Sequence, residues 1–384
     1  MEFKEYTLSQ LSKDNKGTYG IGAPAVEFNK NLYTYLRITD INEDGTLNYN
    51  NLKSVDDENA DKYLLEQGDI VFARTGNSTG KSYYYDGEIC NLVYAGFLIK
   101  FSLDDKKVNP KYIKYYTMTR EYKNWVKEIQ TGSTRGNINE KMYGNMKIKL
   151  PPREYQDKMV NLLDKIDKKI KLNNQTNDNL FNLGDALYKE LYENKDKITN
   201  DWKICKLIDV AENYDAKRKP MSSREREEHQ GKYPYYGATS IIDYVEDYIF
   251  DGTYLLMGED GTVVTDDNKP VLQYIWGKNW VNNHAHILRG TKISTEHLMF
   301  CLRNTNVRDI ITGAVQPKIN QENMNNIKII FGNKETNQIF EKTINSLMKH
   351  YKNNIEENKR LTNLRDTLLP KLMNREINLD NIKL

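Results

Sequence analysis

The segment from Gly76 to Ser82 comes nearest to a motif that could do chemistry. It reads Gly-Asn-Ser-Thr-Gly-Lys-Ser. A phosphate-binding P-loop needs four residues between its glycines, whereas this segment has three, and Thr75 stands where the first glycine belongs. The residues from Ser82 to Tyr85 have the composition of a strand, while a P-loop leads into a helix. The segment therefore does not predict nucleotide binding.

The histidines and cysteines do not form a predicted catalytic or metal site either. His284 and His286 alternate on an expected strand and face the same side, but no cysteine or carboxylate accompanies them at ligand spacing, so a hydrogen-bonded or DNA-facing pair is favoured over a metal site. The chain has no Asn-Pro-Pro-Tyr-type tetrapeptide, such as amino-methylating enzymes use on a flipped base. We therefore predict no catalytic residue, metal or cofactor in this chain. The cysteines are too few and too far apart for a disulfide framework or a zinc site: Cys90, Cys205 and Cys301.

Composition indicates a protein with much solvated or partner-covered surface. The 384 residues exceed one ordinary core, and they are 38% hydrophobic and 29% charged. The net charge of +2 lacks the basic excess of a stand-alone DNA-binding protein, so any DNA-binding charge must be locally concentrated or supplied by partners. The sequence lacks an apolar run long enough to span a membrane and its N-terminus is charged, which predicts a cytoplasmic protein.

An internal repeat is the most informative pattern in the chain. The segment from Ile129 to Asn139 matches the segment from Ile310 to Asn320, with Thr131 opposite Thr312, a shift of 181 residues. The shift continues through Lys147-Ile148, which matches Lys328-Ile329. We therefore expect two copies of one structural frame.

The same shift relates two long stretches with seam residues spaced alternately by three and four. This spacing is typical of a coiled coil, in which one stripe of a helix packs against a partner helix, and a polar Asn in the stripe fixes the register. The alternative is that each stripe is the core face of an ordinary helix. The seam residues are Met159, Leu163, Ile166, Ile170, Asn173, Asn177, Leu180, Leu187 and Leu191, and Phe340, Ile344, Leu347, Tyr351, Asn354, Asn358, Leu361, Leu368 and Leu372.

These patterns predict an α+β protein in which two β-rich α/β globules alternate with two long helices. The globules span residues 1–150 and 201–332, and the helical segments span 151–200 and 333–384. If the first helix leads the chain to the second globule, the second helix returns antiparallel to it. The expected result is a dumbbell with pseudo-twofold symmetry.

The second globule and the chain end resemble the specificity subunits of type I restriction-modification enzymes. The resemblance lies in Tyr-Pro-Tyr-Tyr-Gly-Ala-Thr-Ser from Tyr233, Leu-Leu-Met-Gly-Glu-Asp-Gly from Leu255, Val-Asn-Asn-His-Ala-His from Val281, Thr-Gly-Ala-Val-Gln-Pro-Lys from Thr312, and Leu-Leu-Pro-Lys-Leu-Met from Leu368. In the first globule, Thr131-Gly-Ser-Thr-Arg135 replaces the Gly-Ala-Val-Gln-Pro form. The layout extends the resemblance over essentially the whole chain.

This resemblance implies a non-catalytic subunit with two target-recognition domains, each reading one half of a split sequence in double-stranded DNA. It implies two modification subunits that methylate adenine at N6 with S-adenosylmethionine. A restriction subunit, with ATP and Mg²⁺, can join them. The helical pair acts as spacer and docking site. Two other classes stay open: a coiled-coil scaffold that organises proteins without DNA, and a catalytic nuclease or methyltransferase fragment.

Candidate DNA contacts lie on loops whose side chains reach base edges or phosphates. For each of them, a solvated loop or an ordinary charge run is the structural alternative. In the first globule they are Arg74, Thr75, Asn77, Ser78, Lys81, Thr131, Ser133, Thr134 and Arg135. In the second they are Lys217, Arg218, Lys219, Tyr235, Tyr236, Gly237, Ala238, Thr239, Glu259, Asp260, His284, His286, Gln316 and Lys318.

Overall fold

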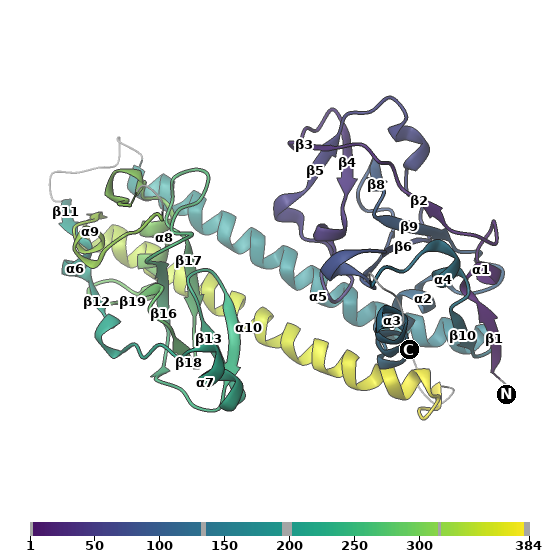
Figure 1. Cartoon of the computed structure of the whole chain (residues 1–384). Helices are drawn as coiled ribbons and strands as arrows, with labels where there is room; N and C mark the ends of the chain where they lie inside the picture. The colour runs from purple at the N-terminus through teal and green to yellow at the C-terminus, as the bar shows by residue number, and fades with distance from the viewer. Residues whose placement is uncertain (1–2, 132–135, 194–201, 314–315, 380–384) are drawn as a thin grey trace. The chain divides into compact units, whose positions relative to one another are not determined.

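The computed structural model describes residues 3–131, 136–193, 202–313 and 316–379 (Figure 1). The chain divides into two compact units, Met1–Ile170 with Lys359–Leu384, and Lys171–Asn358. Both boundaries between the units fall inside long helices. No helix in the described ranges combines the length and the apolar character that crossing a membrane requires.

The described part of the first unit contains a strand pair and two four-stranded sheets. The pair joins β1 (Lys4–Thr7) to β10 (Lys147–Leu150). One sheet has the order β2 (Thr18–Tyr19), β9 (Leu98–Ser102), β6 (Asp69–Ala73) and β7 (Ser82–Tyr84), and the other the order β3 (Ala25–Val26), β5 (Lys53–Val55), β4 (Tyr33–Leu36) and β8 (Leu92–Tyr94). The short helices are α1 (Leu8–Leu11), α2 (Pro110–Tyr116), α3 (Arg120–Thr131) and α4 (Glu140–Gly144).

The second unit repeats this plan in its described part. The strand pair joins β11 (Lys203–Lys206) to β20 (Lys328–Phe331). One sheet has the order β12 (Ala211–Asn213), β19 (Ala285–Gly290), β16 (Tyr254–Gly258) and β17 (Leu272–Ile275), and the other the order β14 (Ile241–Val245), β13 (Gln230–Tyr236), β18 (Lys278–Val281) and β15 (Phe250–Asp251). The short helices are α6 (Leu207–Val210), α7 (Ser223–Glu228), α8 (Thr295–Arg303) and α9 (Gln321–Asn325).

The repeat of 181 residues in the sequence is present in the fold. The helices α4 and α9 start at residues separated by this shift, and so do β10 and β20. Each helix has an N-cap asparagine that satisfies a backbone N–H of the first turn: Asn139 accepts from Met142, and Asn320 accepts from Asn323. In each unit one strand pair of a sheet is parallel, β4 with β8 and β13 with β18.

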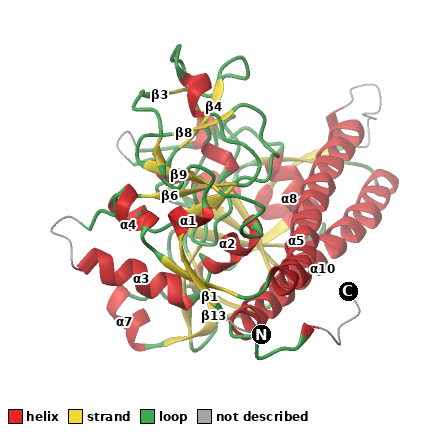
Figure 2. Ribbon diagram, turned by 90° about the vertical axis from the view of Figure 1, so that its right-hand side faces the viewer, coloured by secondary structure: helices red, strands yellow, loops and turns green. Residues whose placement is uncertain are grey.

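The long helices α5 (Arg153–Tyr188) and α10 (Lys334–Met373) pack together, as predicted (Figure 1, Figure 2). Their contacts run antiparallel. In the first unit Arg365 pairs with Asp167 at 3.1 Å, and in the second Asn358 contacts Asn173 at 2.8 Å. A π-helical turn at Lys189–Glu193 follows α5.

Each unit has a hydrophobic core to which both long helices contribute. In the first, Met159 and Leu163 of α5 and Leu372 of α10 join the sheet and α2 residues. In the second, Tyr188 and Phe340 join strand residues and α8. The globular part of each unit, called its module below, therefore packs on the sections of α5 and α10 that belong to the same unit.

The most buried residues of α5 leave the predicted leucine positions after Asn177. Beyond it the buried residues are Gly184, Tyr188 and Tyr192, and the predicted Leu180, Leu187 and Leu191 lie half-buried beside them. The spacing there approaches an 11-residue repeat, which follows a straight helix more closely than a heptad does. Large rings cause the change, because Tyr188 and Tyr192 stack on each other and meet the edge of Phe340.

The other predicted seam residues are all buried or half-buried. Those that are buried are Met159, Leu163, Ile166, Asn173, Asn177, Phe340, Ile344 and Leu372. Those that are half-buried are Ile170, Leu347, Tyr351, Asn354, Asn358, Leu361 and Leu368.

Candidate DNA-recognition loops

Each module brings its two candidate loops together by the same backbone hydrogen bond. In the first module, the N–H of Ile138 donates to the carbonyl of Arg74 at 3.0 Å, directly after β6. In the second, the N–H of Ile319 donates to the carbonyl of Glu259 at 2.9 Å, directly after β16. The repeat therefore places one strand end and one loop side by side in both modules, and the side chains on them differ.

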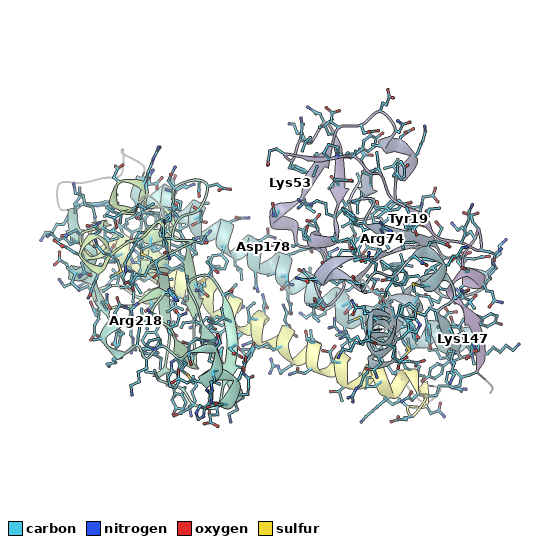
Figure 3. The ribbon with its side chains drawn as sticks, in the orientation of Figure 1. Tyr19, Lys53, Arg74, Lys147, Asp178 and Arg218 are labelled. Atoms are coloured by element: carbon cyan, nitrogen blue, oxygen red, sulfur yellow. The ribbon has the colours of Figure 1, made fainter. Side chains whose placement is uncertain are left out.

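Arg74 presents a cation between two aromatic rings at this place in the first module. Its guanidinium carbon lies 5.1 Å from the ring centre of Tyr19 and 6.0 Å from that of Phe97. Figure 3 labels Arg74 next to Tyr19. Both rings are well exposed. The Nε atom is buried, and no described residue accepts a hydrogen bond from it. The rings restrict a planar group whose donors match guanine or phosphate acceptors.

Several of the remaining candidates of the first module already contact other residues of the protein. Thr75 donates its hydroxyl to Oδ1 of Asn137 at 2.8 Å, which ties the two loops together a second time. Lys81 pairs with Glu43 at 2.9 Å, and the segment after it is the strand β7, as predicted. Asn77 is exposed and Ser78 half-buried. The hydroxyl of Thr131 donates to backbone carbonyls of its own helix. Ser133, Thr134 and Arg135 lie outside the described residues.

In the second module a charged network occupies the corresponding place. Nη1 of Arg218 donates to Glu259 at 2.5 Å and to the carbonyl of Ala285 at 2.9 Å. Lys318 lies 3.4 Å from the same carboxylate. Arg218 is thus engaged inside the module. Lys217 and Lys219 on either side of it are exposed, with Lys217 over the ring of Tyr214.

Three groups of this network have the types and proximity that a metal ion requires: Asp215, Glu259 and His286. The ring of His286 is buried, with Nδ1 2.6 Å from Asp215 and Nε2 2.8 Å from the carbonyl of Ile319. Both ring nitrogens therefore already face oxygen atoms of the protein, one a carboxylate and the other a backbone carbonyl. Burial alone raises the pKa of Asp215, but hydrogen bonds from His286 and the Ile287 N–H outweigh it and lower that pKa. The three groups therefore read as a structural cluster.

The other candidates of the second module divide into inward and outward groups. Tyr235 is buried and its hydroxyl accepts from the N–H of Met221 at 2.9 Å. Tyr236 and Ala238 are half-buried, and Gly237 is buried in the turn that its N–H closes with Ser240. His284 lies 2.5 Å from Asp260. The exposed candidates among these are Thr239, His284, Gln316 and Lys318, in addition to Lys217 and Lys219.

The sequence did not indicate Tyr19, Phe97 or Asp215 as members of these sites. Each is isolated in the chain from the residue that it contacts, and no spacing rule joins them. An arginine at the end of a strand often has a partner, but the sequence does not show which residue that partner is.

Comparison with known proteins assigns the family. A family model described as the type I restriction modification DNA specificity domain matches residues 2–181 and again residues 199–364. A proposed type I restriction enzyme specificity subunit of Haemophilus influenzae is 35% identical over 130 residues, which are 34% of this chain and 32% of that protein. The HindI specificity subunit of the same organism is 20% identical over 481 residues, covering 98% of this chain and 100% of that one.

The fold is also similar to a solved structure. The crystal structure of the S subunit of a type I restriction-modification system from M. genitalium matches with a TM-score of 0.56 at 16% identity, over 97% of this chain and 96% of that one. The chain therefore belongs to the type I restriction-modification DNA specificity family, which is non-catalytic. It is a DNA specificity subunit of such a system, and the resemblance seen in the sequence is confirmed.

Proposed function

We propose that residues 1–150 and 201–332 are target-recognition domains, each of which reads one half of a split sequence in double-stranded DNA. One observation carries the proposal: the same hydrogen bond joins strand end and loop in both modules, at Arg74 in one and Glu259 in the other. Two modules that share a backbone arrangement but carry different side chains at the same place can each recognise a different DNA half-site. Base edges discriminate sequence, whereas phosphate contacts set position.

In this proposal the helix pair sets the spacing between the half-sites and docks the partners. Large apolar side chains remain exposed on both helices: Leu172, Leu183, Ile339 and Leu364. Exposed apolar side chains on long helices suit packing against helices of another chain. The partners are two modification subunits that methylate adenine at N6, joined in some complexes by restriction subunits. S-adenosylmethionine, ATP and Mg²⁺ bind to those partners, and the target is chromosomal DNA in the cytoplasm.

Arg74 is the residue that we assign to base reading in the first half-site. Its fork matches O6 and N7 of guanine, and one such bidentate contact gives about 1–3 kcal/mol of discrimination. Glu259 is engaged with Arg218, so reading in the second module falls to its exposed neighbours, Gln316 and Lys318 foremost.

The experiment is to express the chain with its modification subunits and map the methylated motif by methylation-aware sequencing. The expected motif has two short half-sites separated by a gap without sequence preference. Arg74→Ala should relax letters in one half-site alone. The matched control is Arg120→Ala, which removes an arginine elsewhere on the same module. A continuous motif in the unmodified protein, or altered letters in both halves of the variant, would contradict the proposal.

A further inference from the structure

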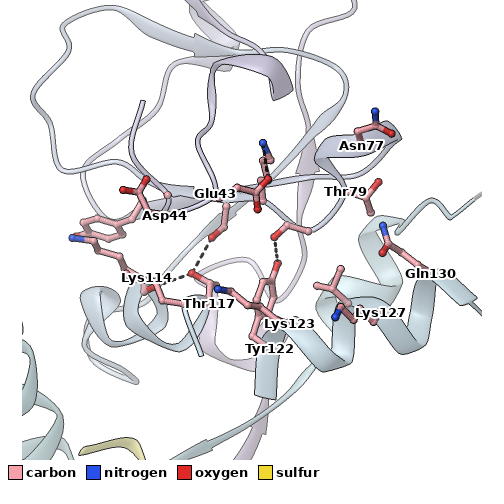
Figure 4. Close-up of a pocket in the computed structure, with 17 residues that line it drawn as sticks. Glu43, Asp44, Asn77, Thr79, Lys114, Thr117, Tyr122, Lys123, Lys127 and Gln130 are labelled. Atoms are coloured by element: carbon pink, nitrogen blue, oxygen red, sulfur yellow. Dashed lines mark hydrogen bonds and ion pairs between the residues drawn. The ribbon is translucent and has the colours of Figure 1, made fainter. Parts of the chain in front are cut away.

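A cavity of about 310 Å³ lies in the first module between the glycine-rich segment after β6 and the helix α3. Asn77 and Thr79 line it from the loop, and Lys123, Lys127 and Gln130 line it from the helix (Figure 4). The hydroxyl of Tyr122 closes its floor by donating to the carbonyl of Gly80 at 2.7 Å. The cavity holds four lysines together with amide and hydroxyl groups. Its lining also includes the carboxylates of Glu43 and Asp44 and the apolar side chains of Met118 and Val126.

Only some of the lysines in this cavity carry uncompensated charge. Lys81 pairs with Glu43, and Lys114 lies 2.6 Å from Asp167. For Lys123 and Lys127, both exposed, no carboxylate of the described residues lies within ion-pair distance. They stand one turn apart on α3, where like charges at i and i+4 repel each other. A bound anion between them would remove that repulsion.

The cavity adjoins the recognition loops. Asn77 lies three residues after Arg74, and α3 ends at Thr131, six residues before Asn137, which contacts Thr75. An anion held here therefore lies beside the loops assigned to base reading.

We propose that Lys123 and Lys127, with Asn77 and Gln130, bind a backbone phosphate of the DNA next to the first half-site. Lysine binds phosphate as a compact point charge, and amide side chains donate to phosphate oxygens. Such a contact sets the position of the module on the duplex and carries no sequence information. The inference rests on the proposed function, because it takes duplex DNA as the ligand.

The test uses the complex with its modification subunits and measures DNA binding at several salt concentrations. Lys123→Ala with Lys127→Ala should weaken binding roughly 5–50-fold at low salt. It should also make the slope of log K against log salt shallower by about 0.9, because one phosphate contact is lost. The loss should be equal on target and random duplexes, and the methylated motif should keep its letters. The control, Lys30→Ala with Lys106→Ala, removes the same charge at exposed sites outside the cavity and should leave the slope unchanged.

Three outcomes would overturn the inference: an unchanged slope, an equal change in the control, or altered half-site letters. A further arm titrates inorganic phosphate and ATP against the unmodified complex. If the double variant no longer bound free phosphate but its DNA affinity depended on salt as before, the cavity would be assigned to a free anion instead. If the unmodified complex reads no split motif, the proposed function fails. If it reads one and the double variant binds as before, only this inference fails.

Discussion

Asn173 donates a hydrogen bond from Nδ2 to Oδ1 of Asn358 across the two long helices at 2.8 Å. Asn354 donates to Asn177 at 2.9 Å one turn away. Residues 173 and 354 are equivalent in the repeat, and so are 177 and 358. In each bond the residue at the first of these positions donates to the residue at the second on the other helix, so the two bonds follow the internal repeat. Asn173 and Asn177 are buried, and polar groups at a seam fix the register of a helix pair because a slipped register leaves them unsatisfied.

Asn173→Ala should lower the free energy of unfolding by about 1–3 kcal/mol, because it removes the donor to a partly buried acceptor. Urea unfolding followed by helical circular dichroism measures this. Asn179→Ala on the same helix is the control: Asn179 is exposed, and alanine favours a helix slightly, so its stability should stay level or rise. Equal effects of the two substitutions would show that the seam contact contributes nothing.

The repeat made most of the fold predictable. The shift of 181 residues correctly related the short helices α4 and α9, the strands β10 and β20, and the starts of both long helices. After Asn177 the predicted Leu180, Leu187 and Leu191 are only half-buried, because leucine spacing alone cannot show that Tyr188 and Tyr192 will stack inside the second module. Periodicity reports which residues share a face, and the neighbouring domain decides which face is buried.

The candidate sites were predictable as loops but not as contacts. Arg74 was identified by its position after a strand, whereas its rings come from Tyr19 and Phe97, which no local pattern links to it. Arg218 looked like part of an exposed basic cluster, and the structure engages it with Glu259, 41 residues away. Ion pairs between distant segments depend on tertiary packing and leave no periodic trace in sequence.

Gly184→Ala should destabilise the second module although alanine favours a helix. A Cβ there would lie 2.4 Å from the ring of Phe300 and 2.8 Å from Ile344. Overpacking of this kind costs about 1–3 kcal/mol, which outweighs the gain of about 1 kcal/mol from replacing a helical glycine. Thermal unfolding should show a lower melting temperature. Ala186→Gly, at an exposed position on the same helix, measures how much the difference in helix propensity between alanine and glycine contributes to stability. A stabilised Gly184→Ala protein would contradict the expected clash.

Arg218→Met should act on stability more than on DNA contact. The guanidinium is largely buried against Glu259, Asp215 and the carbonyl of Ala285, and removing one partner of a buried pair costs about 3–5 kcal/mol. Lys217→Met, at the exposed neighbouring position, should change stability by less than about 0.5 kcal/mol. Thermal melts of both variants separate the two roles. If Arg218→Met kept the normal melting temperature and lost only DNA affinity, Arg218 would be a DNA ligand.

Asp167 should make the first unit sensitive to acid. Burial by itself raises the pKa of this carboxyl, but Lys114 at 2.6 Å and Arg365 at 3.1 Å outweigh it and hold the pKa below its ordinary value. A lowered pKa in the fold means that the stabilisation is complete above the unfolded value of about 3.9 and is lost as the pH falls through the folded value.

Asp167→Asn should therefore lower the melting temperature at pH 7, where it leaves Arg365 and Lys114 without their shared carboxylate, and the difference from the unmodified protein should shrink below about pH 4. Melting temperatures between pH 7 and pH 2.5 give both curves. Asp366→Asn is the matched control, because Asp366 also contacts Arg365 at 3.0 Å but is largely exposed, and solvent screens such a pair. Its curve should stay close to that of the unmodified protein. Parallel curves for Asp167→Asn and the unmodified protein across the acid range would mean that the acid transition comes from other carboxyls.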